Sequence, residues 1–349
     1  MSASDPVDLR VPGLHWRWFG IASGCLVAAV LLGVILGPAN LAPWQVVREL
    51  LGSIFFISDA SSLTSTEQTI LWDLRLPRVV LGGLVGAMLS LAGASYQGVF
   101  RNPLADPYLL GIAAGAGLGA TFVMVNVSSP SAILLPFAAF VGAISAVALA
   151  YLVGRSVGGR SSLTLVLAGV AVAAFLTALQ TYLQQRNTET IRQVYSWILG
   201  RLSTTGWSDV TLLLPYVAIC AMVLLFHRRF LDVMSVGDVE ADSLGISSSK
   251  VRAIVVVAAT LGTAASVAVS GLIAFVGIVV PHTVRLIVGP SYRSILPLSM
   301  LFGAAFLILS DLVARIIASP AELPIGVITA FIGAPFFVLV LRTSRGSIV

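Results

Sequence analysis

Long apolar runs alternate with short polar segments along almost the whole chain. Each run holds about 17 to 25 residues, the length with which an α-helix crosses roughly 30 Å of hydrocarbon. The runs are 18–37, 78–98, 110–127, 132–154, 163–183, 210–228, 251–270, 272–289, 296–317 and 325–341. Gly271 is the clear break between the seventh run and the eighth. The pattern predicts an all-α membrane protein with about ten transmembrane helices.

The polar segments are too short for a soluble domain, so the predicted spans form a single membrane domain, residues 18–345. It lies between a short N-terminal tail, 1–17, and a C-terminal tail, 346–349. The first tail carries Arg10 and Arg17 and leads into a span without a small-residue cleavage site, which predicts an uncleaved anchor. Composition agrees with a membrane protein, since 58% of the 349 residues are hydrophobic, 10% are charged and the mean hydropathy is +1.00.

The arginines predict the orientation of the chain in the lipid bilayer, because positive residues of short loops stay in the cytoplasm. Placing the N-terminus inside puts most of them in cytoplasmic loops, and ten spans then leave both termini inside. The net charge of +5 therefore reflects membrane topology and does not indicate nucleic-acid binding. The predicted outer loops hold Arg48, Arg75, Arg78, Arg186, Arg192 and Arg201.

Catalytic and metal-binding patterns are absent from the sequence: there is no HExxH, GxSxG or CxxC, and the three histidines are scattered. Cys25 and Cys220 lie in apolar runs, where a free thiol behaves as a small hydrophobic group. The single lysine, Lys250, follows three serines instead of the glycines of a phosphate-binding loop. We expect no bound cofactor, and uphill transport would need an ion gradient or a separate ATPase.

Glycines recur four residues apart in two predicted spans. Gly82 and Gly86 share one helix face, as do Gly111, Gly115 and Gly119. This spacing predicts close approach of neighbouring helix backbones.

Charged residues inside the predicted spans are few. Asp311 and Arg315 lie four residues apart in the ninth run and can pair on one helix face. Two interpretations remain open: a self-neutralising pair near the outer end, or a docking site for a partner. The spans hold almost no other carboxylate, which counts against an ion-gradient-driven carrier.

A polar segment, 231–252, separates the sixth and seventh runs and holds four of the 15 acidic residues. Asp238 is predicted to cap a short helix that Gly245 ends. A merely solvated loop is the alternative. The acids are Asp232, Asp238, Glu240 and Asp242. The apolar side chains available for contact are Val239, Leu244 and Ile246.

Seven motifs follow one another in a fixed order. They are RLPR (Arg75–Arg78), QGVFRNPLADPYLLG (Gln97–Gly111), VLAGVA (Val166–Ala171), SVGDVEADSLG (Ser235–Gly245), GLIAFVGIVVPHTVRL (Gly271–Leu286), DLVAR (Asp311–Arg315) and ELPIGVITAFIGAPFF (Glu322–Phe337). Over about residues 15 to 345 the chain resembles the FecCD family of permeases. These are membrane subunits of binding-protein-dependent ABC importers for ferric siderophores, haem and vitamin B12.

The resemblance implies a type II ABC importer permease with ten helices in the bacterial cytoplasmic membrane. Its implied partners are a second permease copy or sister chain, two ABC ATPases that use ATP and Mg²⁺, and an extracytoplasmic binding protein. The implied ATPase-coupling residues, within the loop 231–250, are Ser235, Gly237, Asp238, Glu240, Ala241, Leu244 and Gly245. The implied docking residues for the binding protein are Arg75, Arg78 and Arg315.

The same resemblance implies a cytoplasmic gate and transport by alternating access. The implied gate residues are Asn102, Leu104, Ser161 and Ser162. A ferric siderophore is the favoured cargo because that class is the commonest in the family, and haem and cobalamin are the alternatives. A secondary carrier and an intramembrane enzyme are the hypotheses from other classes.

Overall fold

The computed structural model describes residues 16–39, 41–54, 63–129, 131–156, 162–202 and 206–344. These ranges are helical and contain no β-strand, which confirms the all-α prediction. The α-helices are α1 (Trp16–Ile35), α2 (Pro43–Ile54), α3 (Ser65–Thr69), α4 (Leu76–Phe100), α5 (Ile112–Asn126), α6 (Leu134–Ser156), α7 (Ser162–Arg186), α8 (Ile191–Ile198), α9 (Ser208–Met234), α10 (Asp238–Ser243), α11 (Ser248–Ser270), α12 (Val276–Val288), α13 (Tyr292–Ile316) and α14 (Ile325–Ser344). Shorter turns are η1 (Ile70–Arg75, π-helical), η2 (Pro107–Leu110) and η3 (Thr188–Thr190).

Each predicted apolar run contains one of these helices. In the described residues, seven helices are long and apolar enough to cross a membrane: α1, the stretch Ser65–Phe100 that contains α4, and α6, α7, α9, α11 and α13. The shorter apolar helices α5, α12 and α14 occupy the remaining three runs. α12 differs most from the prediction because it begins only at Val276. Gly271 and Phe275, both with positive φ, interrupt the helix before it.

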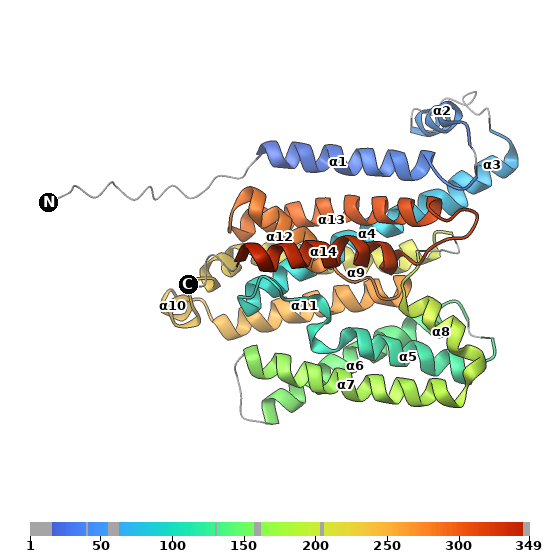
Figure 1. Cartoon of the computed structure of the whole chain (residues 1–349). Coiled ribbons are helices and arrows are strands. Elements are labelled where there is room, and N and C mark those ends of the chain that lie inside the picture. Colours follow the sequence, from blue (N-terminus) through green and yellow to red (C-terminus); the bar gives the residue numbers. More distant parts are fainter. Residues whose placement is uncertain are drawn as a thin grey trace.

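The helix α4 runs through the middle of the bundle. Of the most apolar 18 residues in the stretch that contains α4, 83% are buried, whereas in α1 the corresponding share is 22%. α4 packs against α13, α11, α9 and α12, whereas α1 lies on the outside against α13 (Figure 1). In a membrane an apolar helix can face either lipid or protein, and α1 is as uniformly apolar as α4. Contact with four neighbouring helices, and not the apolar pattern, therefore places α4 at the centre.

Close helix packing follows the predicted glycine spacing. Added Cβ atoms at Gly115 and Gly119 would overlap backbone oxygens of α6, and one at Gly86 would overlap a backbone oxygen of α13. An added Cβ at Gly82 would lie 3.2 Å from a side-chain carbon of Leu202, a tight contact. Gly111 is the N-cap residue of α5 with φ +84°, and it lies in ordinary contact with the backbone of α7. The small residues let α5 approach α6 and α4 approach α13.

Gly93→Ala is expected to destabilise the protein. A Cβ at Gly93 would overlap the backbone of Gly277, where α4 crosses α12. Overpacking of this kind costs about 1–3 kcal/mol. Gly24→Ala in α1 is the matched control, because nothing lies within 4 Å of its added Cβ. Thermal unfolding in detergent measures the difference, and equal melting temperatures for the two variants would contradict this packing.

Amphipathic elements were missed by the search for wholly apolar runs. The outer loop predicted over 41–73 contains α2, α3 and most of η1, and α8 precedes α9. The segment predicted as a loop, 231–250, is mostly helical as well. α9 continues to Met234 and α11 begins at Ser248, so only 235–247 forms a turn, with α10 inside it. We call residues 235–247 the coupling turn, because the predicted ATPase-coupling residues lie in it; the coupling itself stays a prediction.

Candidate functional site

The helical bundle has two opposite ends (Figure 1). One end carries α10, together with the start of α1 and the last turn of α14, and we call it the α10 end. The other end carries α2, α3 and α8, and we call it the α8 end.

The short helix α10 is capped, but not as predicted. Gly237 is the N-cap residue and Asp238 is the first helical residue, so the prediction that Asp238 caps the helix is wrong by one position. The C-terminal prediction is confirmed: Gly245 has φ +80° and its N–H donates to Asp242 O at 3.0 Å. The N–H of Ile246 donates to Ala241 O, which completes a Schellman motif.

Asp238 instead ties α10 to two neighbouring helices. Its carboxylate lies 2.7 Å from Arg252 Nη2 in α11 and 3.1 Å from Arg101 Nη2 at the end of α4. Ala241 is fully buried and packs α10 onto the core. Asp238, which the sequence pattern predicted to be a helix cap, therefore fixes the coupling turn to both α4 and α11.

The neighbouring acids also act inside the chain. Asp242 Oδ1 accepts a hydrogen bond from Ser248 N at 2.9 Å, which satisfies a free N–H at the start of α11. Asp232, at the end of α9, accepts from Tyr292 N and Ser291 Oγ at the start of α13. Both acids therefore link helix ends inside the chain.

Apolar side chains form the outer face of the coupling turn. Val236, Val239 and Leu244 are 74%, 79% and 71% exposed. Ile246, predicted to join them, is partly buried against the core instead. Glu240 is exposed beside this face. The exposed surface of α10 itself is mixed, because Glu240, Asp242 and Ser243 are exposed along with Val239.

Two of the predicted gate residues, Asn102 and Leu104, lie at the same end, next to the Arg101–Asp238 ion pair. Asn102 and Leu104 follow α4, and Asn102 Oδ1 accepts from Leu104 N at 2.9 Å, which holds this loop in a tight turn. Asp106 accepts from Tyr108 N at 2.7 Å, and burial raises the pKa of Asp106 to about 6. Ser161 lies outside the described residues, and Ser162 begins α7 without a described side chain. The gate itself stays a prediction.

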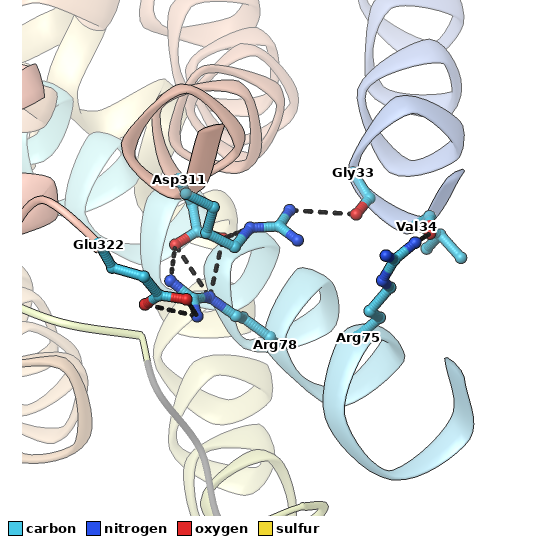
Figure 2. A network of polar contacts seen from close by, with 7 residues as sticks. Gly33, Val34, Arg75, Arg78, Asp311 and Glu322 are labelled. Carbon is cyan, nitrogen blue, oxygen red and sulfur yellow. Dashed lines mark hydrogen bonds and ion pairs between the residues drawn. The ribbon is translucent and has the colours of Figure 1, made fainter. Parts of the chain in front are cut away.

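At the α8 end, a network of charges crosses three helices (Figure 2). Asp311 in α13 accepts from Arg78 Nη2 at 2.9 Å and pairs with Arg315 Nε at 3.0 Å. Its side chain is only 3% exposed. The Nη1 atom of Arg78 donates to both oxygens of Glu322 at 3.0 Å. The predicted pairing of Asp311 with Arg315 is confirmed, and Arg78 and Glu322 enlarge it.

Two of the predicted docking arginines hold the end of α1. Arg75 donates to Val34 O at 3.0 Å, to Ile35 O at 2.9 Å and to Ala39 O, while Arg315 donates to Gly33 O at 3.0 Å (Figure 2). The last carbonyls of a helix have no partner within it and favour cations. Arg75 and Arg315 are 5% and 3% exposed, so both guanidinium groups are committed inside the chain. Docking by all three arginines stays a prediction.

The sequence pattern missed the partners of these residues. Arg101, Arg252 and Glu322 complete the ion pairs at the two ends. Glu322 lies within a motif that the resemblance supplied, and Arg101 lies within another. Their pairing depends on helices that meet only in the folded chain.

The profile of the FecCD transport family matches residues 25–343. The chain belongs to the FecCD transport family. It is 42% identical to the cobalamin import system permease protein BtuC of Halobacterium salinarum, over 79% of this chain and 74% of that protein. It is 39% identical to the Fe(3+)-citrate import system permease protein YfmD of Bacillus subtilis, over 80% of this chain and 84% of that protein.

A solved structure shows the same architecture. This FecCD chain superposes with a TM-score of 0.82 on a protein described as a metal-chelate type ABC transporter in an inward-facing conformation. The two are 29% identical, and the match covers 94% of this chain and 99% of the other. The fold is therefore that of a type II ABC importer permease, as the motifs predicted.

Proposed function

We propose that this FecCD chain is the permease subunit of an ATP-driven importer that moves an iron chelate, with a ferric siderophore as the favoured cargo, into the cytoplasm. The observation that carries the proposal is the near full-length match to a metal-chelate type ABC transporter. The family match over residues 25–343 supports it. Cobalamin is the second candidate, because a cobalamin import permease is 42% identical.

The partners follow from the two ends of the bundle. We place the α10 end in the cytoplasm of a bacterial cell membrane, as the arginine distribution predicts. The exposed apolar face of the coupling turn, Val236, Val239 and Leu244, suits a cleft on each of two ABC ATPases. A binding protein docks at the α8 end, and a second permease chain completes the pathway. ATP and Mg²⁺ belong to the ATPases.

Transport proceeds by alternating access. ATP-driven closure of the ATPases moves the coupling turn of each permease chain. Asp238 passes this motion to Arg101, and hence to the end of α4, which leads directly into the gate residues Asn102 and Leu104. Arg252 passes it to α11 in the same way. No residue of this chain takes part in covalent chemistry in this scheme.

A gradient-driven carrier is the alternative from a different class. Such a carrier needs a membrane carboxylate that is free to exchange a coupling ion. Asp311 is the buried acid of α13, and two arginines already occupy it. This arrangement favours the ATP-driven importer.

Reconstituted uptake tests the proposal. The ATPase and binding protein that co-purify with the tagged chain are identified by mass spectrometry and assembled with it in proteoliposomes. We expect ATP-dependent uptake of a radiolabelled ferric siderophore that an ionophore leaves unchanged. Uptake of labelled cobalamin alone would select the second candidate. Uptake that needs an ion gradient and ignores ATP would contradict an ATP-driven importer.

A further inference from the structure

A polar cavity of about 210 Å³ opens at the α8 end beside the charge network. Its charged lining consists of Arg78, Arg201, Asp311 and Glu322. Three of these residues belong to the network of Figure 2, whereas Arg201 belongs to none of its ion pairs. The cavity therefore adds a cation that neither the motifs nor the comparisons single out.

The backbone of Arg201 is fixed at the wall of this cavity. Arg201 N donates to Ser270 O at 2.8 Å, and Gly200 O accepts from Ile325 N at 3.3 Å. Gly200 has φ +75°, and an added Cβ there would lie 2.6 Å from Leu272 O, so the turn requires glycine. Residues 200 and 201 therefore form hydrogen bonds with both the end of α11 and the start of α14. The backbone of Arg201 is thus held in place by hydrogen bonds, and the residue is exposed.

The side chain of Arg201 has no carboxylate partner within the described part of the chain. The cluster holds three guanidinium groups, Arg78, Arg201 and Arg315, and two carboxylates, Asp311 and Glu322, which gives a formal charge of +1. A net positive charge beside an open polar cavity attracts an anionic group. The local charge therefore favours one further carboxylate.

The two acids of the cluster differ in how firmly they are held. Asp311 is 3% exposed and paired with two arginines. Glu322 is 42% exposed and pairs with Arg78 alone. An exposed ion pair contributes about 1 kcal/mol or less. Another carboxylate can therefore take the place of Glu322 on Arg78, whereas Asp311 is held too firmly to be displaced.

We propose that Arg201 and Arg78 together bind a carboxylate side chain of the binding protein, and that Glu322 occupies Arg78 until that carboxylate arrives. Two arginines, Arg78 and Arg201, line the same cavity, and guanidinium groups form strong hydrogen bonds with carboxylates. This inference rests on the proposed function, because it requires a binding protein that docks at the α8 end. Arg201 is then a docking residue in addition to Arg78.

Binding measurements with single variants test the inference. The purified binding protein from the reconstitution is titrated against the complete permease–ATPase complex in nanodiscs. Arg201→Gln is expected to raise the Kd about tenfold, since it removes one partner of a charge-assisted pair. Glu322→Gln is expected to lower the Kd up to about fivefold, because it frees Arg78. Arg192→Gln is the matched control: Arg192 is exposed on α8 but does not line the cavity.

Each outcome decides a separate point. An Arg201→Gln complex that is monodisperse and binds like the Arg192→Gln control would overturn the role of Arg201. An unchanged or raised Kd for Glu322→Gln would overturn its role as the occupant of Arg78. Absence of binding by the unsubstituted complex would overturn the proposed function first, and this inference with it. Rescue of Arg201→Glu by an acid-to-arginine exchange in the binding protein would confirm direct pairing.

Discussion

Asp238→Lys is expected to abolish ATP-driven uptake while the permease stays in the membrane. Asp238 lies between Arg101 and Arg252, so a lysine there would place three cations together. Like charges at this distance repel, and both arginines lose their acceptor. The coupling turn then detaches from α4 and α11. We expect uptake to fall by about tenfold or more, corresponding to on the order of 1.4 kcal/mol or more in coupling.

Glu240→Lys separates this internal role from partner contact. Glu240 is exposed next to Val239 on α10 and forms no ion pair in the described structure. Its exchange should weaken ATPase association more than it disturbs the permease fold. Uptake in proteoliposomes, the ATPase rate and the amount of co-purified ATPase are measured for both variants.

A charge exchange supplies the control for Asp238. Asp238→Lys combined with Arg101→Asp restores one opposite pair between the coupling turn and α4, so partial recovery of uptake is expected. Normal transport and normal ATPase association in Asp238→Lys would contradict the assignment of the coupling turn. Failure of the double variant, with Asp238→Lys correctly inserted, would place the essential contact at Arg252 instead.

Arg78→Gln is expected to weaken docking of the binding protein by about a hundredfold, because Arg78 is the most exposed of the three predicted docking arginines. The fold should survive, since Arg315 still pairs with Asp311 at 3.0 Å. The double variant Arg75→Glu with Arg78→Glu should weaken docking as well. Its effect would be mixed, however, because Arg75 also holds the end of α1.

Arg75→Gln is the comparison that separates the two effects. Arg75 is buried and donates to three carbonyls near the end of α1, so its loss leaves these groups unsatisfied at a cost of about 1–3 kcal/mol. We expect a lower melting temperature with a smaller effect on the Kd. Measured Kd values and thermal unfolding of both variants distinguish the roles. An unchanged Kd in Arg78→Gln would contradict docking at this end and the orientation of the chain.

The seven candidate spans and the three shorter apolar helices could be predicted because apolar runs of this length are local in sequence. The alternating pattern places a helix in every run, from α1 to α14. Gly245 also acts locally, since an αL residue after a short helix needs only its own neighbours. By contrast, α2 and α8 are amphipathic, so a search for wholly apolar runs passes over them.

The roles of the charged residues could not be predicted from local sequence, because their partners lie far away along the chain. Arg315 and its acceptor Gly33 are 282 positions apart, and Arg78 and Glu322 are 244 apart. The motif resemblance identified Arg75, Arg78 and Arg315 as a group. It did not show that two of them cap α1, nor that Arg201 faces the same cavity.

The sequence alone determined that this chain is a multi-span membrane protein with the motifs of a FecCD permease, because hydropathy and motifs depend on neighbouring residues. The tertiary structure decided which charges are free. Asp238 reads as a helix cap in sequence but binds Arg101 and Arg252 once α4, α10 and α11 meet. The physical reason is that a buried or half-buried charge takes the nearest opposite group, and helix packing alone brings those groups together.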